Sequence, residues 1–185
     1  MSGNFEENLI RHCAATLAGH KCGSLFSYYP AQDEDVPCEI SEADALLSAK
    51  GLRVLLLKAC PRGSLVYVYR PSGLRKKLAD PATGTYLGAL GYDVTDADSC
   101  LRTLASRVCL ADFPHEIGIF LDYPLSDVIA FTENGGRNCL CTGCWKAYSD
   151  AETALRRFSL YRKCRDVYLR CYRRGFGITR LAVAA

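Results

Sequence analysis

The sequence predicts an α+β fold in which a mainly antiparallel or mixed β-sheet is covered by several α-helices. Three observations predict this class: helical and strand-like segments alternate irregularly, two adjacent strand-like segments are spaced as a hairpin, and no βαβ unit repeats. The 185 residues are 49% apolar and 23% charged, a composition typical of globular proteins. Because no segment reads as a long linker, we expect a single domain over residues 1–185.

The N-terminal segment is expected to form two helices and one strand before the hairpin. Apolar residues at helical spacing predict a helix over residues 5–18, and a β-prone segment follows over residues 24–29. The acidic segment 31–39 contains Pro37 and is interpreted as a surface loop. Ser41 is then expected to cap a helix that ends at Gly51.

The hairpin is the clearest element of the sequence. Residues 53–59 and 64–70 are strand-like, and the four residues 60–63 between them supply the proline and glycine that a tight turn needs. Proline or aspartate signals then predict three helices, over residues 71–78, 81–91 and from Asp96 or Asp98 to Cys109.

The C-terminal half is expected to alternate strands and helices. The apolar run 117–121 predicts a central strand, and Pro124 suits the first turn of a helix that ends near residue 134. A strand at residues 144–148 leads into a long helix over residues 150–174, and residues 178–183 predict a last strand.

Charge is concentrated on the long C-terminal helix. Residues 151–175 contain eight Arg or Lys residues against Glu152 and Asp166, although the whole chain has a net charge of only +3. This amphipathic helix is expected to present a solvated basic face, with an acidic protein partner as the alternative. Nucleic acid is disfavoured as a partner because the tyrosines of this segment fall on the apolar stripe, which leaves no stacking platform.

The sequence also indicates a compartment. No apolar run is long enough to cross a bilayer, and the N-terminus lacks the basic and apolar regions of a signal peptide. We therefore expect a cytoplasmic protein without a membrane-spanning segment. Its eleven cysteines are expected to be reduced thiols, several of them at core positions.

Several segments resemble one known family. They are residues 114–124 (PHEIGIFLDYP), residues 127–128 (DV), residues 143–148 (GCWKAY), residues 12–19 (HCAATLAG) and residues 66–71 (VYVYRP). Their order is similar to that of an uncharacterised bacterial family catalogued as domain of unknown function 3793. The resemblance implies a single-domain cytosolic protein typical of anaerobic bacteria, and it implies no activity. The family prefers proline at Ala15 and an aromatic residue at Cys144, so this chain departs from the pattern at both.

The leading functional hypothesis is a non-catalytic binding or accessory protein. Its ligand or partner is expected to meet the surface near His115, Glu116, Tyr123 and Trp145. Adjacent side chains on a strand point to opposite faces, so His115 and Glu116 should separate, with one of them buried against a partner. No complete cofactor motif is present, and the ligand stays unassigned.

A thiol-dependent enzyme is the first alternative. Cys13, on the first predicted helix, would be the nucleophile, with His115 as its base and Glu116 or Asp122 orienting the imidazole ring. The competing interpretation places Cys13 in the core beside the apolar residues of that helix.

A metal site is the second alternative. Cys139, Cys141 and Cys144 form a C-x-C-x-x-C cluster whose thiolates could converge on zinc or an iron–sulfur cluster. A closed zinc site needs four ligands, and the sequence contains no second C-x-x-C. The cluster is therefore interpreted first as packed or surface thiols.

Overall fold

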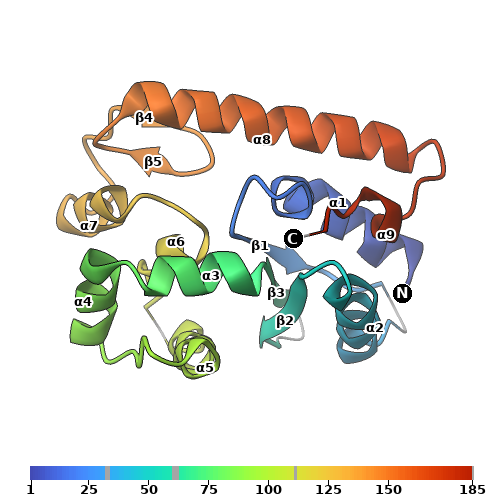
Figure 1. The fold of residues 1–185 in the computed structure, drawn as a ribbon, viewed down its shortest axis with the longest axis horizontal. Helices are drawn as coiled ribbons and strands as arrows, with labels where there is room; N and C mark the ends of the chain where they lie inside the picture. The colour runs from blue at the N-terminus through green and yellow to red at the C-terminus, as the bar shows by residue number, and fades with distance from the viewer. Residues whose placement is uncertain (32–33, 60–62, 111, 185) are drawn as a thin grey trace.

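A three-stranded antiparallel sheet lies at the centre of the protein (Figure 1). The computed structural model describes residues 1–31, 34–59, 63–110 and 112–184. The strands are β1 (Gly23–Tyr28), β2 (Arg53–Lys58) and β3 (Ser64–Tyr69), in the order β1-β3-β2. The α+β class and the two hairpin strands are thus confirmed, while residues 60–62 of the predicted turn lie outside the described residues.

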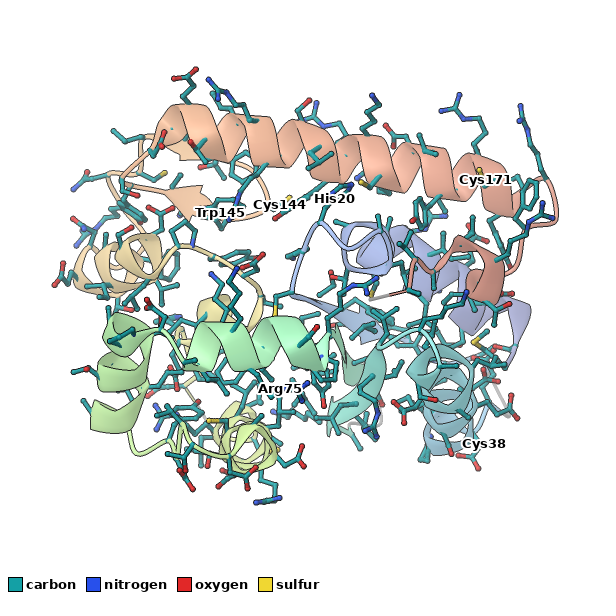
Figure 2. The ribbon with its side chains drawn as sticks, in the orientation of Figure 1. His20, Cys38, Arg75, Cys144, Trp145 and Cys171 are labelled. Atoms are coloured by element: carbon teal, nitrogen blue, oxygen red, sulfur yellow. The ribbon has the colours of Figure 1, made fainter. Side chains whose placement is uncertain are left out.

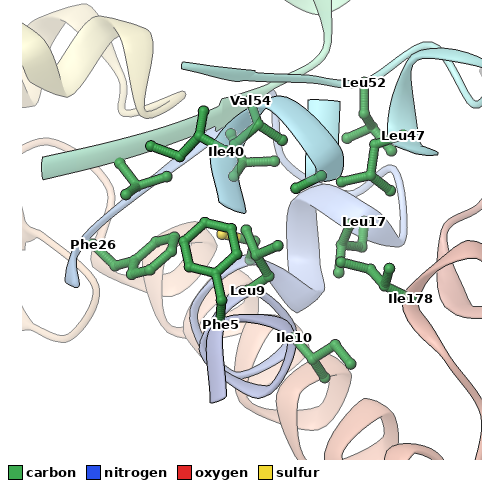
Figure 3. Packing of buried hydrophobic residues seen from close by; sticks show 14 of the residues in the cluster. Phe5, Leu9, Ile10, Leu17, Phe26, Ile40, Leu47, Leu52, Val54 and Ile178 are labelled. Carbon is green, nitrogen blue, oxygen red and sulfur yellow. The ribbon is translucent and has the colours of Figure 1, made fainter. Parts of the chain in front are cut away.

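The two faces of β3 belong to two different core clusters. Val66 and Val68 face the helices α1 (Gly3–Leu17) and α2 (Val36–Ser48), in the cluster drawn in Figure 3. Tyr67 and Tyr69 point to the other face, because side chains alternate along a strand. The sheet is therefore buried on both faces by apolar side chains of the helices around it.

The second face of the sheet is covered by four helices. They are α3 (Pro71–Leu78), α4 (Pro81–Ala89), α5 (Ala97–Val108) and α6 (Ile117–Phe120). The predicted starts of α4 and α5 are correct, and Asp80 and Asp96 accept hydrogen bonds from the first turns of these helices. The Tyr67 hydroxyl donates to the Phe120 carbonyl over 2.7 Å, which joins β3 to α6.

A close approach at Gly23 fixes the distance between β1 and α6. A Cβ atom at this position would lie 2.5 Å from the Tyr67 hydroxyl and would also collide with the Phe120 carbonyl. Only glycine fits here because both obstacles are themselves held by the hydrogen bond between Tyr67 and Phe120.

The C-terminal half forms a separate layer. It comprises α7 (Leu125–Glu133), the short strands β4 (Cys141–Thr142) and β5 (Lys146–Ala147), α8 (Ala151–Tyr172) and α9 (Ile178–Leu181). Figure 1 shows α8 running along one side of the molecule, over the β4–β5 hairpin and α1. A third core cluster, which includes Ala14, Trp145 and Phe158, joins the hairpin and α8 to α1, whereas α7 and α9 pack into the other two clusters. Among the described residues, every helix is too short or too polar to cross a bilayer.

Two predicted strands are wrong. Residues 117–120 form the short helix α6, and Leu121, its C-cap, donates its amide hydrogen to Ile117 O. A short apolar run that is buried on all sides has no periodicity that separates strand from helix. Residues 178–183 contain the helix α9 instead of a strand, because the Glu6 carboxylate accepts the Ile178 amide hydrogen at the helix start.

Two boundaries also differ from the prediction. The helix predicted from Ser41 begins at Val36, inside the expected loop, and Asp35 caps it. Pro37 lies in its first turn, where a missing N–H costs no hydrogen bond, so the proline signals a helix start and not a loop. The strand predicted at residues 144–148 is reduced to β5.

Arg70 joins the end of α1 to the C-terminal segment of the chain at Val183. Its side chain is 7% exposed, and its guanidinium donates hydrogen bonds of 2.8–2.9 Å to the carbonyls of Thr16, Leu17 and Val183. The first two carbonyls belong to the last turn of α1, which carries partial negative charge. Each of these two carbonyls also accepts from a backbone amide, Thr16 O from Gly19 N and Leu17 O from Val183 N, and Arg70 adds a charged donor to both.

We expect Arg70→Met to lower the free energy of unfolding by about 3 kcal/mol, because it keeps the apolar stem and removes three charge-assisted hydrogen bonds. Urea denaturation measures the change. The exposed Arg75→Met is the matched control and should stay within about 0.5 kcal/mol of wild type. Equal effects of the two substitutions would contradict this role of Arg70.

Candidate ligand-binding site

An apolar pocket of about 530 Å³ opens between α6, α7 and the β4–β5 hairpin. Its apolar walls are Phe113, Ile117, Leu121, Val128, Phe131 and Trp145. We call it the apolar pocket. Its size falls within the range of about 300–1,000 Å³ that is typical of small-molecule sites.

The structure brings three of the four predicted ligand residues to this pocket. His115, Tyr123 and Trp145 all line it. The Tyr123 and Trp145 rings stack with centroids 5.1 Å apart, and the His115 ring meets the Phe131 ring edge-on at 5.0 Å. Figure 2 shows Trp145 beside the β4–β5 hairpin, beneath α8.

Glu116 lies elsewhere. Its side chain is 5% exposed, and it accepts hydrogen bonds from the Tyr92 hydroxyl at 2.9 Å and from the Arg107 guanidinium. His115 and Glu116 thus separate as predicted, although they do so at the start of a helical turn and not on a strand. The carboxylate ties α5 to α6, and it does not line the apolar pocket.

Asp127 positions the tryptophan. Its carboxylate is 3% exposed and accepts from the Trp145 indole N–H at 2.8 Å, the Tyr148 and Ser149 amides at 2.9 and 3.0 Å, and the Ser149 hydroxyl at 2.9 Å. These four hydrogen bonds offset the free-energy cost of burying the carboxylate away from water. They join α7 to the hairpin and to the start of α8.

The other edge of Trp145 is also fixed. Its ring contacts Phe158 of α8 in a T-shaped arrangement with centroids 4.5 Å apart. Gly143, in the hairpin turn, lies so close to the Phe158 ring that a Cβ atom there would collide with it. The indole is therefore held by a hydrogen bond, a stacked ring and a perpendicular ring, and the wall that it forms is rigid.

Polar groups are few and lie at the edge of the apolar pocket. Lys146 Nζ donates to the Gly136 carbonyl at 2.6 Å and lies 5.9 Å from the centroid of the Phe131 ring. The His115 side chain is exposed. Asp127 already has four donors, so Lys146, His115 and the exposed Thr142 are the groups available to a polar end of a ligand.

Cys13 and His115 are not brought together. Cys13 is fully buried in the core cluster between α1 and the sheet, whereas His115 lines the apolar pocket. Burial raises the pKa of the Cys13 thiol to about 12, because a thiolate in an apolar core loses its hydration. At neutral pH this side chain is a protonated, apolar thiol.

The three clustered cysteines have different surroundings. Cys139 Sγ lies 3.4 Å from the Thr142 hydroxyl, and Cys141 Sγ lies 3.9 Å from the Ala151 carbonyl. Cys144 is exposed. Within the described part of the chain, no group of three or more His, Cys, Asp or Glu side chains is arranged to hold a metal ion.

The sequence did not indicate a role for Asp127, Phe131 or Lys146, although the motifs of the resemblance contain Asp127 and Lys146. Asp127 lies in the first turn of α7, where an acidic residue is common because it stabilises the helix dipole. Its contacts with residues 145–149 are therefore not apparent from the sequence. Phe131 and Lys146 lie far apart in sequence and meet only through the hairpin. The available signal was the order of Pro124, Asp127 and Trp145, which is the only tryptophan of the chain.

We expect Asp127→Ala to lower the free energy of unfolding by about 3 kcal/mol, because it leaves buried donors without an acceptor. Trp145 is the only tryptophan, so its emission should shift to longer wavelength as the indole gains exposure. The exposed Asp166→Ala serves as the control. Unchanged emission in Asp127→Ala would argue against the proposed anchoring.

We expect Cys13 in the folded protein to resist alkylation by iodoacetamide at pH 8, because it is buried and its pKa is about 12. The exposed Cys38, Cys109 and Cys144 should react under the same conditions. Mass spectrometry of peptides reports each site. Rapid modification of Cys13 before unfolding would show that its thiol is accessible after all.

The comparisons with known proteins bear on the family alone. No curated protein and no solved structure matches the chain. The family described as "Protein of unknown function (DUF3793)" matches residues 9–182, which include the sheet, the apolar pocket and α8. The resemblance inferred from the sequence motifs is thereby confirmed. The chain belongs to this family.

Proposed function

We propose that the protein is a non-catalytic binding or accessory protein whose ligand occupies the apolar pocket. One observation carries the proposal: His115, Tyr123 and Trp145 line the same preformed hollow of about 530 Å³. Walls fixed by Asp127 and Phe158 would bind a ligand without a large ordering cost.

The walls indicate the chemistry of the ligand. Phe131 and Trp145 offer aromatic surfaces, and the other walls are mainly aliphatic, which favours an apolar ring system. Lys146 offers a positive charge at the edge, and one carbonyl is its acceptor among the described residues. We therefore propose a small ring compound with one anionic group, whose ring enters the pocket and whose anion contacts Lys146.

Binding without catalysis is favoured by the state of the titratable groups in the pocket. Asp127 is occupied by four donors, and the Tyr123 hydroxyl donates to the Cys144 carbonyl at 2.8 Å. Burial raises the pKa of Tyr123 well above its ordinary value, so the phenol stays neutral. The alternative of a Cys13 and His115 enzyme has less support because the two side chains lie in different parts of the fold.

An accessory role also fits the exposed face of α8. Lys163, Arg170, Arg173 and Arg174 are exposed, and none of them has an ion pair within the described ranges. We propose that this face meets an acidic protein partner, as steering by a basic surface would allow. Cytoplasmic location and an origin in anaerobic bacteria remain part of this proposal.

Titration with 2-naphthoate, followed by the fluorescence of Trp145, tests the ligand site. Thr142 lines the apolar pocket and is exposed, so Thr142→Phe should fill the mouth of the pocket and leave the core intact. We expect binding to weaken at least about tenfold, which corresponds to about 1.4 kcal/mol. The exposed Thr85→Phe on α4 is the matched control. Equal affinity of Thr142→Phe and wild type would refute the site.

A further inference from the structure

A second hollow lies on the other side of Tyr123. Two pockets of about 680 and 630 Å³ share Lys21, and we call them together the basic trough. The first is lined by residues of α1 and α8, including Arg11 and Arg162, and the second by residues of α3 and α8, including Lys76 and Arg157. Figure 2 shows His20 and Cys144, which line the trough, in the space between α8 and α3.

The charges along the trough are unbalanced. Lys21, Lys76, Arg157 and Arg162 line it and have no carboxylate partner in the part of the chain that the structure describes. Three further cations are neutralised in ion pairs: Arg11 with Glu7, Lys77 with Asp122 and Arg165 with Asp166. The Arg70 guanidinium is used by backbone carbonyls. Arg157 also donates to the Asp122 carbonyl at 3.3 Å, and Asp80 lines the trough without an ion pair among the described residues. The cations that line the trough still outnumber its carboxylates.

Lys21 is the central cation. It is half-buried, and its ammonium lies 5.5 Å from the Tyr123 ring centroid and 5.7 Å from that of Tyr161. Among the described residues, Nζ makes these two ring contacts and no hydrogen bond. Burial lowers the pKa of Lys21, because the ammonium loses hydration that the two rings only partly replace. An oxyanion in the trough would supply the missing partner.

We propose that the basic trough binds a small polyanion with at least two phosphate groups, one on each side of Lys21. One group would contact Lys76 and Arg157, and the other would contact Arg162. Each pocket exceeds 600 Å³, which leaves room for an organic moiety beside the phosphates. This site is separate from the apolar pocket and does not depend on the ligand proposed there.

Neighbouring residues on the same helices provide matched controls. Lys76 lines the trough and its neighbour Arg75 does not, although both are exposed cations on α3. Figure 2 shows Arg75 on the side of α3 that faces away from α8. On α8, Arg162 lines the trough and the exposed Lys163 does not. Substitution by glutamine removes one positive charge from either member of a pair, so the comparison holds the net charge constant.

The experiment is calorimetric titration of the full chain with tripolyphosphate at low salt. We expect saturable binding that weakens about tenfold in Lys76→Gln and in Arg162→Gln, the loss typical of one charge-assisted contact. Arg75→Gln and Lys163→Gln should weaken tripolyphosphate binding less than about twofold.

A parallel titration with ATP distinguishes the source of the phosphates. Tighter binding of ATP than of tripolyphosphate indicates a nucleoside-borne group, and equal binding of the two indicates that phosphate alone is recognised.

Acetylation of Lys21 by acetic anhydride gives a second readout that needs no substitution. Tripolyphosphate should protect Lys21 at least about fivefold and leave the exposed Lys163 unchanged, as measured by mass spectrometry. Absence of saturable binding, equal weakening in the control variants, or unprotected Lys21 would overturn the proposal. Binding of 2-naphthoate should be unaffected by Arg162→Gln, so failure here is distinguishable from failure of the apolar pocket.

Discussion

A buried carboxylate must be surrounded by hydrogen-bond donors, and Asp127 takes all of its donors from residues 145–149. This single requirement fixes the hairpin on α7. It also orients Trp145, so the apolar pocket has a rigid wall. Because Asp150 caps α8 directly after these donors, the same carboxylate sets where the long helix begins. The third core cluster then joins α8 to α1 and so to the sheet.

Tyr123 connects the two proposed sites. Its ring stacks on Trp145, which lines the apolar pocket, and it also contacts the ammonium of Lys21 in the basic trough. Asp122, the residue before Tyr123, adopts a positive φ of 65°. Its carboxylate forms an ion pair with Lys77 at 2.9 Å, and this contact holds the turn that positions Tyr123. An apolar pocket and a charged trough can therefore lie close together because one aromatic residue separates their environments.

Much of the fold could be predicted from local signals. The hairpin strands, the helices that start at Pro71 and Pro81, and the long basic helix α8 follow from spacing and capping residues. The errors at α6 and α9 have a common cause, since short apolar segments take their conformation from tertiary partners. For α9 the partner is Glu6, which is more than 170 residues away in sequence. His115, Tyr123 and Trp145, which the resemblance motifs contain, all line the apolar pocket. The hydrogen bonds of Asp127 and the ring contacts of Lys21 join residues that are distant in sequence, so the roles of these two residues could not be predicted.

The most direct measurement is amide hydrogen exchange at Tyr148 and Ser149 in the native protein. These two amides lie outside the helices and strands, and Asp127 Oδ1 is their acceptor. If the buried carboxylate organises this half of the fold, both amides should exchange at least about a hundredfold more slowly than an unstructured peptide, with protection comparable to that of α7. Exchange at the rate of an exposed loop would contradict the central role of Asp127.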